Sequence, residues 1–167
     1  YYDYVEKDFE LIKEAVKIQP NYTRYWISLG EFATTLAKRE QEPEARNNLL
    51  KQAEEYLNKA LALAPKHQEI FVDLANAKIA AGDYVAAKNY SEKCIEINQT
   101  IGECYFYLGL SEIYLNDANE GQKNILASGA KLFNPESKES LGEQADAYAA
   151  IKDYQNLALI FEKLIVL

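Results

Sequence analysis

The chain has 167 residues, 49% of them hydrophobic and 26% charged, which is enough for one substantial domain. Its formal net charge of -8 at pH 7 argues against nucleic acid as a ligand and against direct contact with an anionic membrane, because both need a basic face. No apolar run approaches the roughly 20 residues that span a bilayer.

Helix-forming residues dominate the sequence. Ala, Leu, Glu and Lys recur throughout, while only 7 Gly and 4 Pro interrupt them, and no strand-like alternation of useful length is present. This composition predicts an all-α protein. The sequence starts at Tyr1 and contains no Met, from which we expect a piece of a longer protein.

The first predicted element is a single helix within residues 1–21. Val5, Ile12 and Ala15 suit one helical face, and Pro20 ends the helix because proline cannot continue it. We interpret this element as the second helix of a helix pair whose first helix is missing.

Residues 22–67 follow as a longer pair of helices. Its first helix carries Trp26, and its second ends before Pro65. Compared with the later pairs, this pair contains extra residues around 38–48. These extra residues are polar and favour helix formation, and Pro43 suits the first turn of a helix. We therefore predict two lengthened helices rather than a disordered loop.

A period of 34 residues organises the rest of the chain. Residues 68–101 and 102–135 align, so that the pattern aromatic-x-x-Leu-small at Phe71 returns at Tyr105, and a more divergent copy occupies 138–167. A fixed period of this length predicts stacked helix pairs, each burying its apolar face only against its neighbours.

The aromatic-x-x-Leu-small pattern, followed by Asp83-Tyr84 or Asp153-Tyr154, a late Ala and a Pro, resembles the tetratricopeptide repeat. The resemblance implies a right-handed superhelical solenoid of antiparallel helix pairs, helix A and helix B. It implies nine helices, in a single domain over 1–167. It also implies a non-catalytic protein–protein interaction or scaffold module that binds a peptide or protein segment on its concave helix-A face.

The inward positions of helix A follow from the helical period, because they lie opposite the aromatic and Leu face. Their centre is apolar and acidic residues surround it, so we expect a partner with apolar anchors and basic flanks. Internal packing of these side chains is the alternative. The predicted partner-binding residues are Val72, Asn76, Ile79, Glu103, Phe106, Leu110, Ile113 and Tyr114.

No residue pattern indicates a catalytic site, a cofactor or a metal site. The acidic pairs have no nucleophile or His in register, and the lone His67 cannot complete a zinc site with two cysteines that lack a CxxC spacing. We expect Cys94 and Cys104 to be two buried, reduced thiols. A disulfide is the alternative, because the two residues flank one predicted turn.

A second resemblance concerns the run 144–155 together with 159–165. These segments, and an irregular first repeat before regular ones, are similar to the repeat tails of bacterial O-antigen ligase/polymerase-like membrane proteins. The resemblance implies an extracytoplasmic accessory domain in glycan assembly, whose membrane domain would lie outside this chain. A soluble cytoplasmic adaptor is the other possibility, so the sequence leaves the localisation open.

Overall fold

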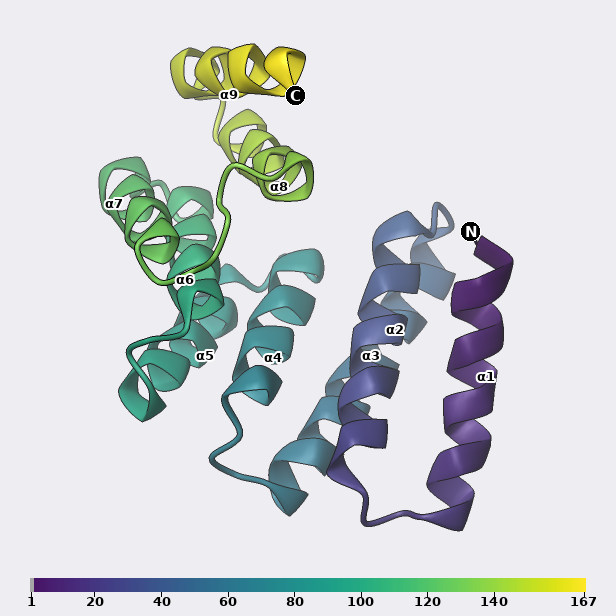
Figure 1. The fold of residues 1–167 in the computed structure, drawn as a ribbon. Helices are drawn as coiled ribbons and strands as arrows, with labels where there is room; N and C mark the ends of the chain where they lie inside the picture. Colours follow the sequence, from purple (N-terminus) through teal and green to yellow (C-terminus); the bar gives the residue numbers. More distant parts are fainter. Residues whose placement is uncertain (1) are drawn as a thin grey trace. The chain divides into compact units, whose positions relative to one another are not determined.

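The computed structural model describes residues 2–167, and within them it contains nine α-helices and no strand (Figure 1). The prediction of an all-α fold with nine helices is thereby confirmed. No helix in this range is both long and apolar enough to cross a membrane. The helices are α1 (Tyr2–Ile18), α2 (Thr23–Arg39), α3 (Pro43–Leu63), α4 (Gln68–Ala80), α5 (Tyr84–Ile97), α6 (Gly102–Tyr114), α7 (Ala118–Gly129), α8 (Lys138–Ala150) and α9 (Tyr154–Val166).

The chain divides into two compact units. Unit 1 is Tyr1–Asp83 and holds α1 to α4, and unit 2 is Tyr84–Leu167 and holds α5 to α9. The assignment of 1–167 to a single repeat domain stays a prediction.

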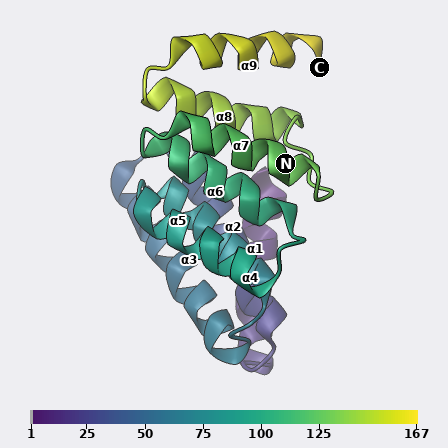
Figure 2. The ribbon, with the colours of Figure 1, turned by 90° about the vertical axis from the view of Figure 1, so that its left-hand side faces the viewer.

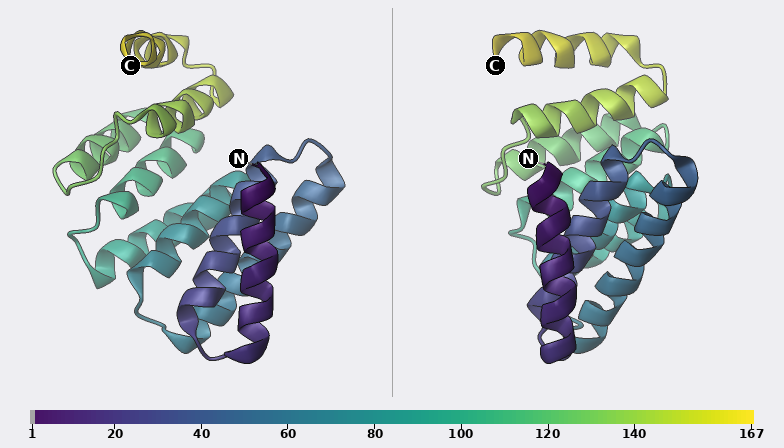
Figure 3. Two further views of the ribbon diagram at one scale, coloured as in Figure 1. Left: turned by 45° about the vertical axis from the view of Figure 1, so that its right-hand side comes forward. Right: turned by 90° about the vertical axis from the view of Figure 1, so that its right-hand side faces the viewer.

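In unit 1, α2 is the central helix and packs against α1, α3 and α4, with α1 along one side (Figure 3). Gly30 of α2 is in direct contact with Leu57 of α3, and a Cβ atom at Gly30 would lie only 2.4 Å from the Leu57 Cγ atom. The two helices approach this closely because the glycine has no side chain. Leu29, Ala33 and Leu74 complete the buried centre of the unit.

The extra residues around 38–48 lengthen the end of α2 and the start of α3, as predicted. Pro43 occupies the first turn of α3, where its missing N–H group costs nothing. The carboxylate of Glu42 accepts a hydrogen bond from the backbone N–H of Ala45 at 2.6 Å and so caps the helix.

In unit 2, α6 is the central helix and packs against α5, α7 and α8, while α9 packs against α8 (Figure 2). Helices α6 and α7 approach each other closely: a Cβ atom at Gly109 would lie 2.5 Å from the carbonyl oxygen of Gly121. Tyr148 and Leu141 of α8 are buried almost completely.

Three turns between helices share one geometry. In each, a residue with positive φ follows the helix, and the N–H of the next residue, an Asp, donates to a carbonyl five residues earlier. This arrangement closes the end of a helix, and the Asp side chains of the last two turns also cap the following helix. The three pairs are Gly82-Asp83, Asn116-Asp117 and Lys152-Asp153.

Candidate binding surfaces

Three of the predicted partner-binding residues are buried in unit 2. Phe106 and Leu110 are 1% exposed and Ile113 is 0% exposed. Ile113 lies one helical turn after Gly109, on the face of α6 that meets α7, and its Cγ1 atom would be 2.7 Å from a Cβ atom at Gly121. The prediction that these three form an accessible apolar floor is therefore wrong. They are internal packing, the alternative that the sequence left open.

Phe106 also has aromatic neighbours that cover it. Its ring centroid lies 4.8 Å from that of Phe133, in the linker after α7, and 5.5 Å from that of Tyr107. The helical period places Phe106 on a face of α6, but the covering ring comes from a loop that the period does not describe.

Tyr114 is half-buried and stacks on Tyr84, with 4.1 Å between ring centroids and 2° between ring planes. Burial raises the pKa of the Tyr114 hydroxyl to about 12, helped by Tyr84 and by the carboxylates of Asp146 and Glu143. Glu103 is exposed in the first turn of α6. Of the predicted residues in unit 2, only Glu103 and part of Tyr114 are accessible.

The predicted residues of unit 1 lie on α4 and remain partly accessible. Val72, Asn76 and Ile79 are half-buried, and the Oδ1 atom of Asn76 is buried without a hydrogen-bond donor. Asp73 lies between them, and its Oδ2 atom is also buried without a donor. Sequence reasoning missed Asp73, although it is four residues after Glu69 and so belongs to the same helix face.

Carboxylates from two helices meet around Asp73. Burial, together with the negative charges of Glu31 and Glu69, raises the pKa of the Asp73 carboxyl to about 8, although the positive charge of Arg24 opposes this shift. Burial also raises the pKa of Glu31. Arg24 of α2 forms an ion pair with Glu69 of α4. These carboxylates outnumber Arg24 three to one, so a cation is the group that this surface suits.

We call this surface the acidic face of unit 1, made of Arg24, Glu31, Glu69, Asp73 and Asn76. Its buried acceptor oxygens lack donors, and each such atom costs free energy until a donor reaches it. The described residues form no group of three or more His, Cys, Asp and Glu side chains that could hold a metal ion.

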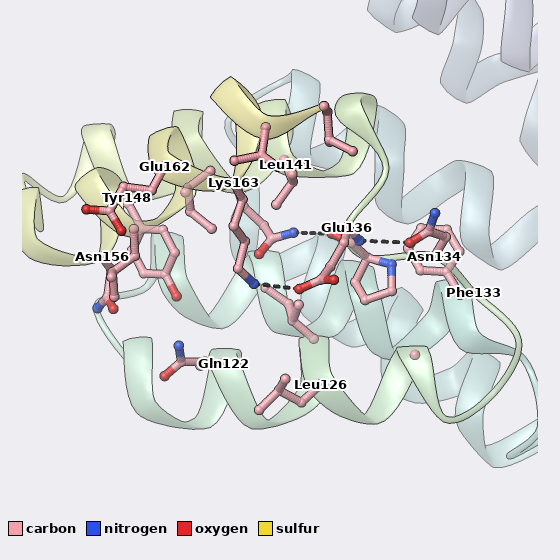
Figure 4. A pocket seen from close by; sticks show the side chains of 18 of the residues that line it. Gln122, Leu126, Phe133, Asn134, Glu136, Leu141, Tyr148, Asn156, Glu162 and Lys163 are labelled. Carbon is pink, nitrogen blue, oxygen red and sulfur yellow. Dashed lines mark hydrogen bonds and ion pairs between the residues drawn. The ribbon is translucent and has the colours of Figure 1, made fainter.

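A groove of about 970 Å³ lies in unit 2 between α7 and α9, with α8 and the linker before it at its base (Figure 4). The ammonium group of Lys163 pairs with the Glu136 carboxylate at 2.6 Å across this space. The groove is predominantly apolar, and its size suits a short peptide segment. Its apolar lining comprises Ile125, Leu126, Leu132, Phe133, Leu141, Leu159, Ile160, Val166 and Leu167.

Cys94 of α5 and Cys104 of α6 are joined by a disulfide, with their Cα atoms 5.8 Å apart. The expectation of two reduced thiols is therefore wrong. Both residues are buried, and the packing of α5 on α6 brings them together across the turn that separates the helices. The sequence spacing allowed this contact, but only the packing of the two helices selects it.

Reduction of the disulfide is expected to destabilise unit 2. Closing a loop of this length stabilises a fold by about 3 kcal/mol through the restricted unfolded chain. The double variant Cys94→Ser, Cys104→Ser should therefore unfold at a lower denaturant concentration than the oxidised protein. Thiol titration of the denatured wild-type protein should detect no free thiol before reduction and two after it. Two thiols without reductant would contradict the bond.

Residues 45–100, from the first turn of α3 to the turn after α5, match the sequence model of the tetratricopeptide repeat. This segment contains a tetratricopeptide repeat. No curated protein matches the chain in sequence. Proteins built from tetratricopeptide repeats are interaction modules, and this is the class of protein to which the repeat and the helical fold point.

Solved structures of tetratricopeptide repeat folds resemble the chain. A thermophilic repeat protein of Thermus thermophilus, TTC0263, has a TM-score of 0.72 at 15% identity, covering 90% of this chain and 74% of that chain. MamA has a TM-score of 0.63 at 17% identity, covering 96% and 86%. YrrB, described as a TPR protein with an unusual peptide-binding site, has a TM-score of 0.58 at 15% identity, covering 98% and 78%. At these identities the similarity establishes the fold alone.

Proposed function

We propose that the chain acts by binding rather than by catalysis, and that its helix-A surface binds a peptide or protein segment. The observation that carries this proposal is the pair of buried acceptor atoms, Asp73 Oδ2 and Asn76 Oδ1, on the acidic face of unit 1. A partner that brings a hydrogen-bond donor with a positive charge would satisfy the acceptor atoms and the excess of carboxylates together.

A Lys or Arg side chain of the partner fits this chemistry. An ionised carboxylate that is buried without a partner is unfavourable, and the usual response is a raised pKa, as for Asp73. A bound ammonium or guanidinium group would stabilise the ionised form and donate to Asn76 as well. This agrees with a partner that carries basic flanks, as expected from the sequence.

The groove of unit 2 is a separate candidate contact, formed by the second helices of two pairs and independent of the acidic face of unit 1, and it suits apolar side chains of a partner. Apolar side chains from α7 and α9 line the groove, and Leu126 and Leu159 leave large parts of their surfaces exposed. Anchors buried in such a groove would contribute most of the affinity, while charges on the rim mainly govern the rate of association. The groove thus replaces Phe106, Leu110 and Ile113 as the proposed apolar contact.

A peptide array tests the role of the acidic face. The probes are randomised peptides that carry Lys at one central position, compared with the same peptides carrying Gln there. The wild-type protein is expected to prefer the Lys peptides, and Asp73→Asn should remove about tenfold or more of that preference. Raising the salt concentration should weaken the preference as well, because the contact is between charges.

Glu139→Gln provides the matched control, because Glu139 is an exposed carboxylate in the first turn of α8. This variant should bind the Lys peptides as the wild-type protein does. Equal binding of Lys and Gln peptides by the wild-type protein, or equal losses in both variants, would contradict the proposed role of the acidic face.

The disulfide favours a second candidate function, an extracytoplasmic accessory domain of an O-antigen ligase/polymerase-like protein. Disulfides persist in oxidising compartments and are rare in the cytosol, and Cys94 and Cys104 are bonded. The test is the coding sequence upstream in the same gene. A series of apolar membrane spans there would support this function, and their absence would count against it.

A further inference from the structure

The terminal helices of the two units, α1 and α9, differ in the surfaces that they leave open. Within unit 1, helix α1 packs against α2. Within unit 2, helix α9 packs against α8. The outer surface of α1 is charged, with exposed residues such as Glu6, Glu14 and Lys17. A polar outer face of this kind is what keeps the end of a repeat stack soluble.

Helix α9 lacks such a polar face. Its thirteen residues include only two charged ones, Glu162 and Lys163, and Lys163 is paired with Glu136. Apolar residues face the groove on one side, and a second apolar stripe lies on the opposite side. A helix that is apolar all round is normally buried. The second stripe consists of Tyr154, Ala158, Phe161 and Ile165.

This second stripe, the α9 seam, is well exposed. Tyr154 is 68% exposed, Phe161 49% and Ile165 84%. Its members are spaced by four, three and four residues, which is the spacing of helices that pack along a common seam. The seam therefore has the pattern of a helix–helix interface, although no helix of unit 2 is described as covering it.

We propose that the α9 seam is the interface of a symmetric dimer, in which α9 packs antiparallel against α9 of a second copy of this chain. The seam is complementary to itself in this orientation. A two-fold axis near its centre places Tyr154 opposite Ile165 of the other copy, and Ala158 opposite Phe161 of the other copy. A small residue thus faces a large one on both sides of the axis, as a symmetric interface requires.

The available area suits a weak, reversible dimer. The exposed parts of Tyr154, Phe161 and Ile165, with the half-buried residues that flank them, amount to roughly 500 Å² per copy. The pair of copies would bury about 1,000 Å², which is near the lower limit for a specific interface. The groove lies on the opposite face of α9 and would stay open to another partner.

Sedimentation equilibrium of the full chain, from low to high micromolar concentration, tests this proposal. The wild-type protein is expected to change from monomer to dimer across this range. Ile165→Glu should raise the dissociation constant by about a hundredfold or more, because it places two charges in the apolar seam. Ile18→Glu is the matched control: Ile18 is 81% exposed near the end of α1 and should leave the dissociation constant unchanged.

A swap of side chains tests the antiparallel register. Ala158→Phe alone should weaken the dimer about tenfold, because two large rings then oppose each other. Adding Phe161→Ala to Ala158→Phe should restore it, since each large residue again faces a small one. Circular dichroism establishes that each variant is folded. A wild-type protein that stays monomeric throughout, or a dimer that Ile18→Glu dissociates as strongly as Ile165→Glu, would overturn the proposal.

Discussion

Asp73→Asn is expected to raise the free energy of unfolding by about 5 kcal/mol more at pH 9 than at pH 4. The carboxyl of Asp73 has a pKa of about 8 in the folded protein, against an ordinary value of 3.8. Between these values the folded protein retains a proton that the unfolded chain releases. The stability of the wild-type protein therefore falls as the pH rises through this interval, and the variant lacks this loss.

Denaturant unfolding of both proteins at pH 4, 6 and 9 measures the effect. The difference between variant and wild type should grow with pH and stop growing above about pH 8. Asp8→Asn, which changes an exposed carboxylate of α1, is the control and should show no comparable growth. A difference independent of pH would show that Asp73 is not held in a buried acidic environment.

The same substitution is expected to act on stability and on binding in opposite directions. Asp73→Asn stabilises the free protein because it removes a buried carboxyl group that folding forces to keep its proton. It weakens the binding of Lys peptides because it removes the carboxylate that a bound ammonium group would stabilise. A residue that serves only the fold would not combine a gain in stability with a loss of binding. A site that costs stability in the free protein is typical of functional surfaces.

Gly109→Ala is expected to destabilise unit 2 by about 3 kcal/mol. The new Cβ atom would lie 2.5 Å from the backbone carbonyl oxygen of Gly121 and 2.8 Å from the Ile125 Cγ1 atom. Since the first contact is with backbone, no side-chain rotation can relieve it, and α7 would have to move away from α6. Thermal or denaturant unfolding of the variant measures the loss.

Gly142→Ala is the matched control for Gly109→Ala, because Gly142 also lies inside a helix but a Cβ atom there would meet nothing within 4 Å. Alanine is the better helix former, so this variant should be more stable than the wild-type protein by about 0.5–1 kcal/mol. Equal losses from the two substitutions would contradict the close contact between α6 and α7.

Much of the helical organisation could be predicted from the sequence, because it depends on local chemistry. Pro43 suits the first turn of a helix, Asp117 and Asp153 cap the helices that follow them, and the 34-residue period marks where one helix pair ends and the next begins. The proline and the two Asp caps act within a few residues, and the period repeats this local chemistry along the chain. The repeat pattern implied nine helices, and the structure contains them in the described residues.

The binding surfaces depended on the tertiary structure, because a helical period describes the faces of one helix and not what covers them. Ile113 and Phe106 lie on faces of α6 that α7 and the linker ring of Phe133 occupy. The raised pKa of Asp73 requires carboxylates from both α2 and α4, and the disulfide of Cys94 requires the packing of α5 on α6. The sequence alone determined the helices and the fold class. The packing of the helices decided the surfaces, because the charge, burial and covalent contacts between helices depend on their arrangement in space.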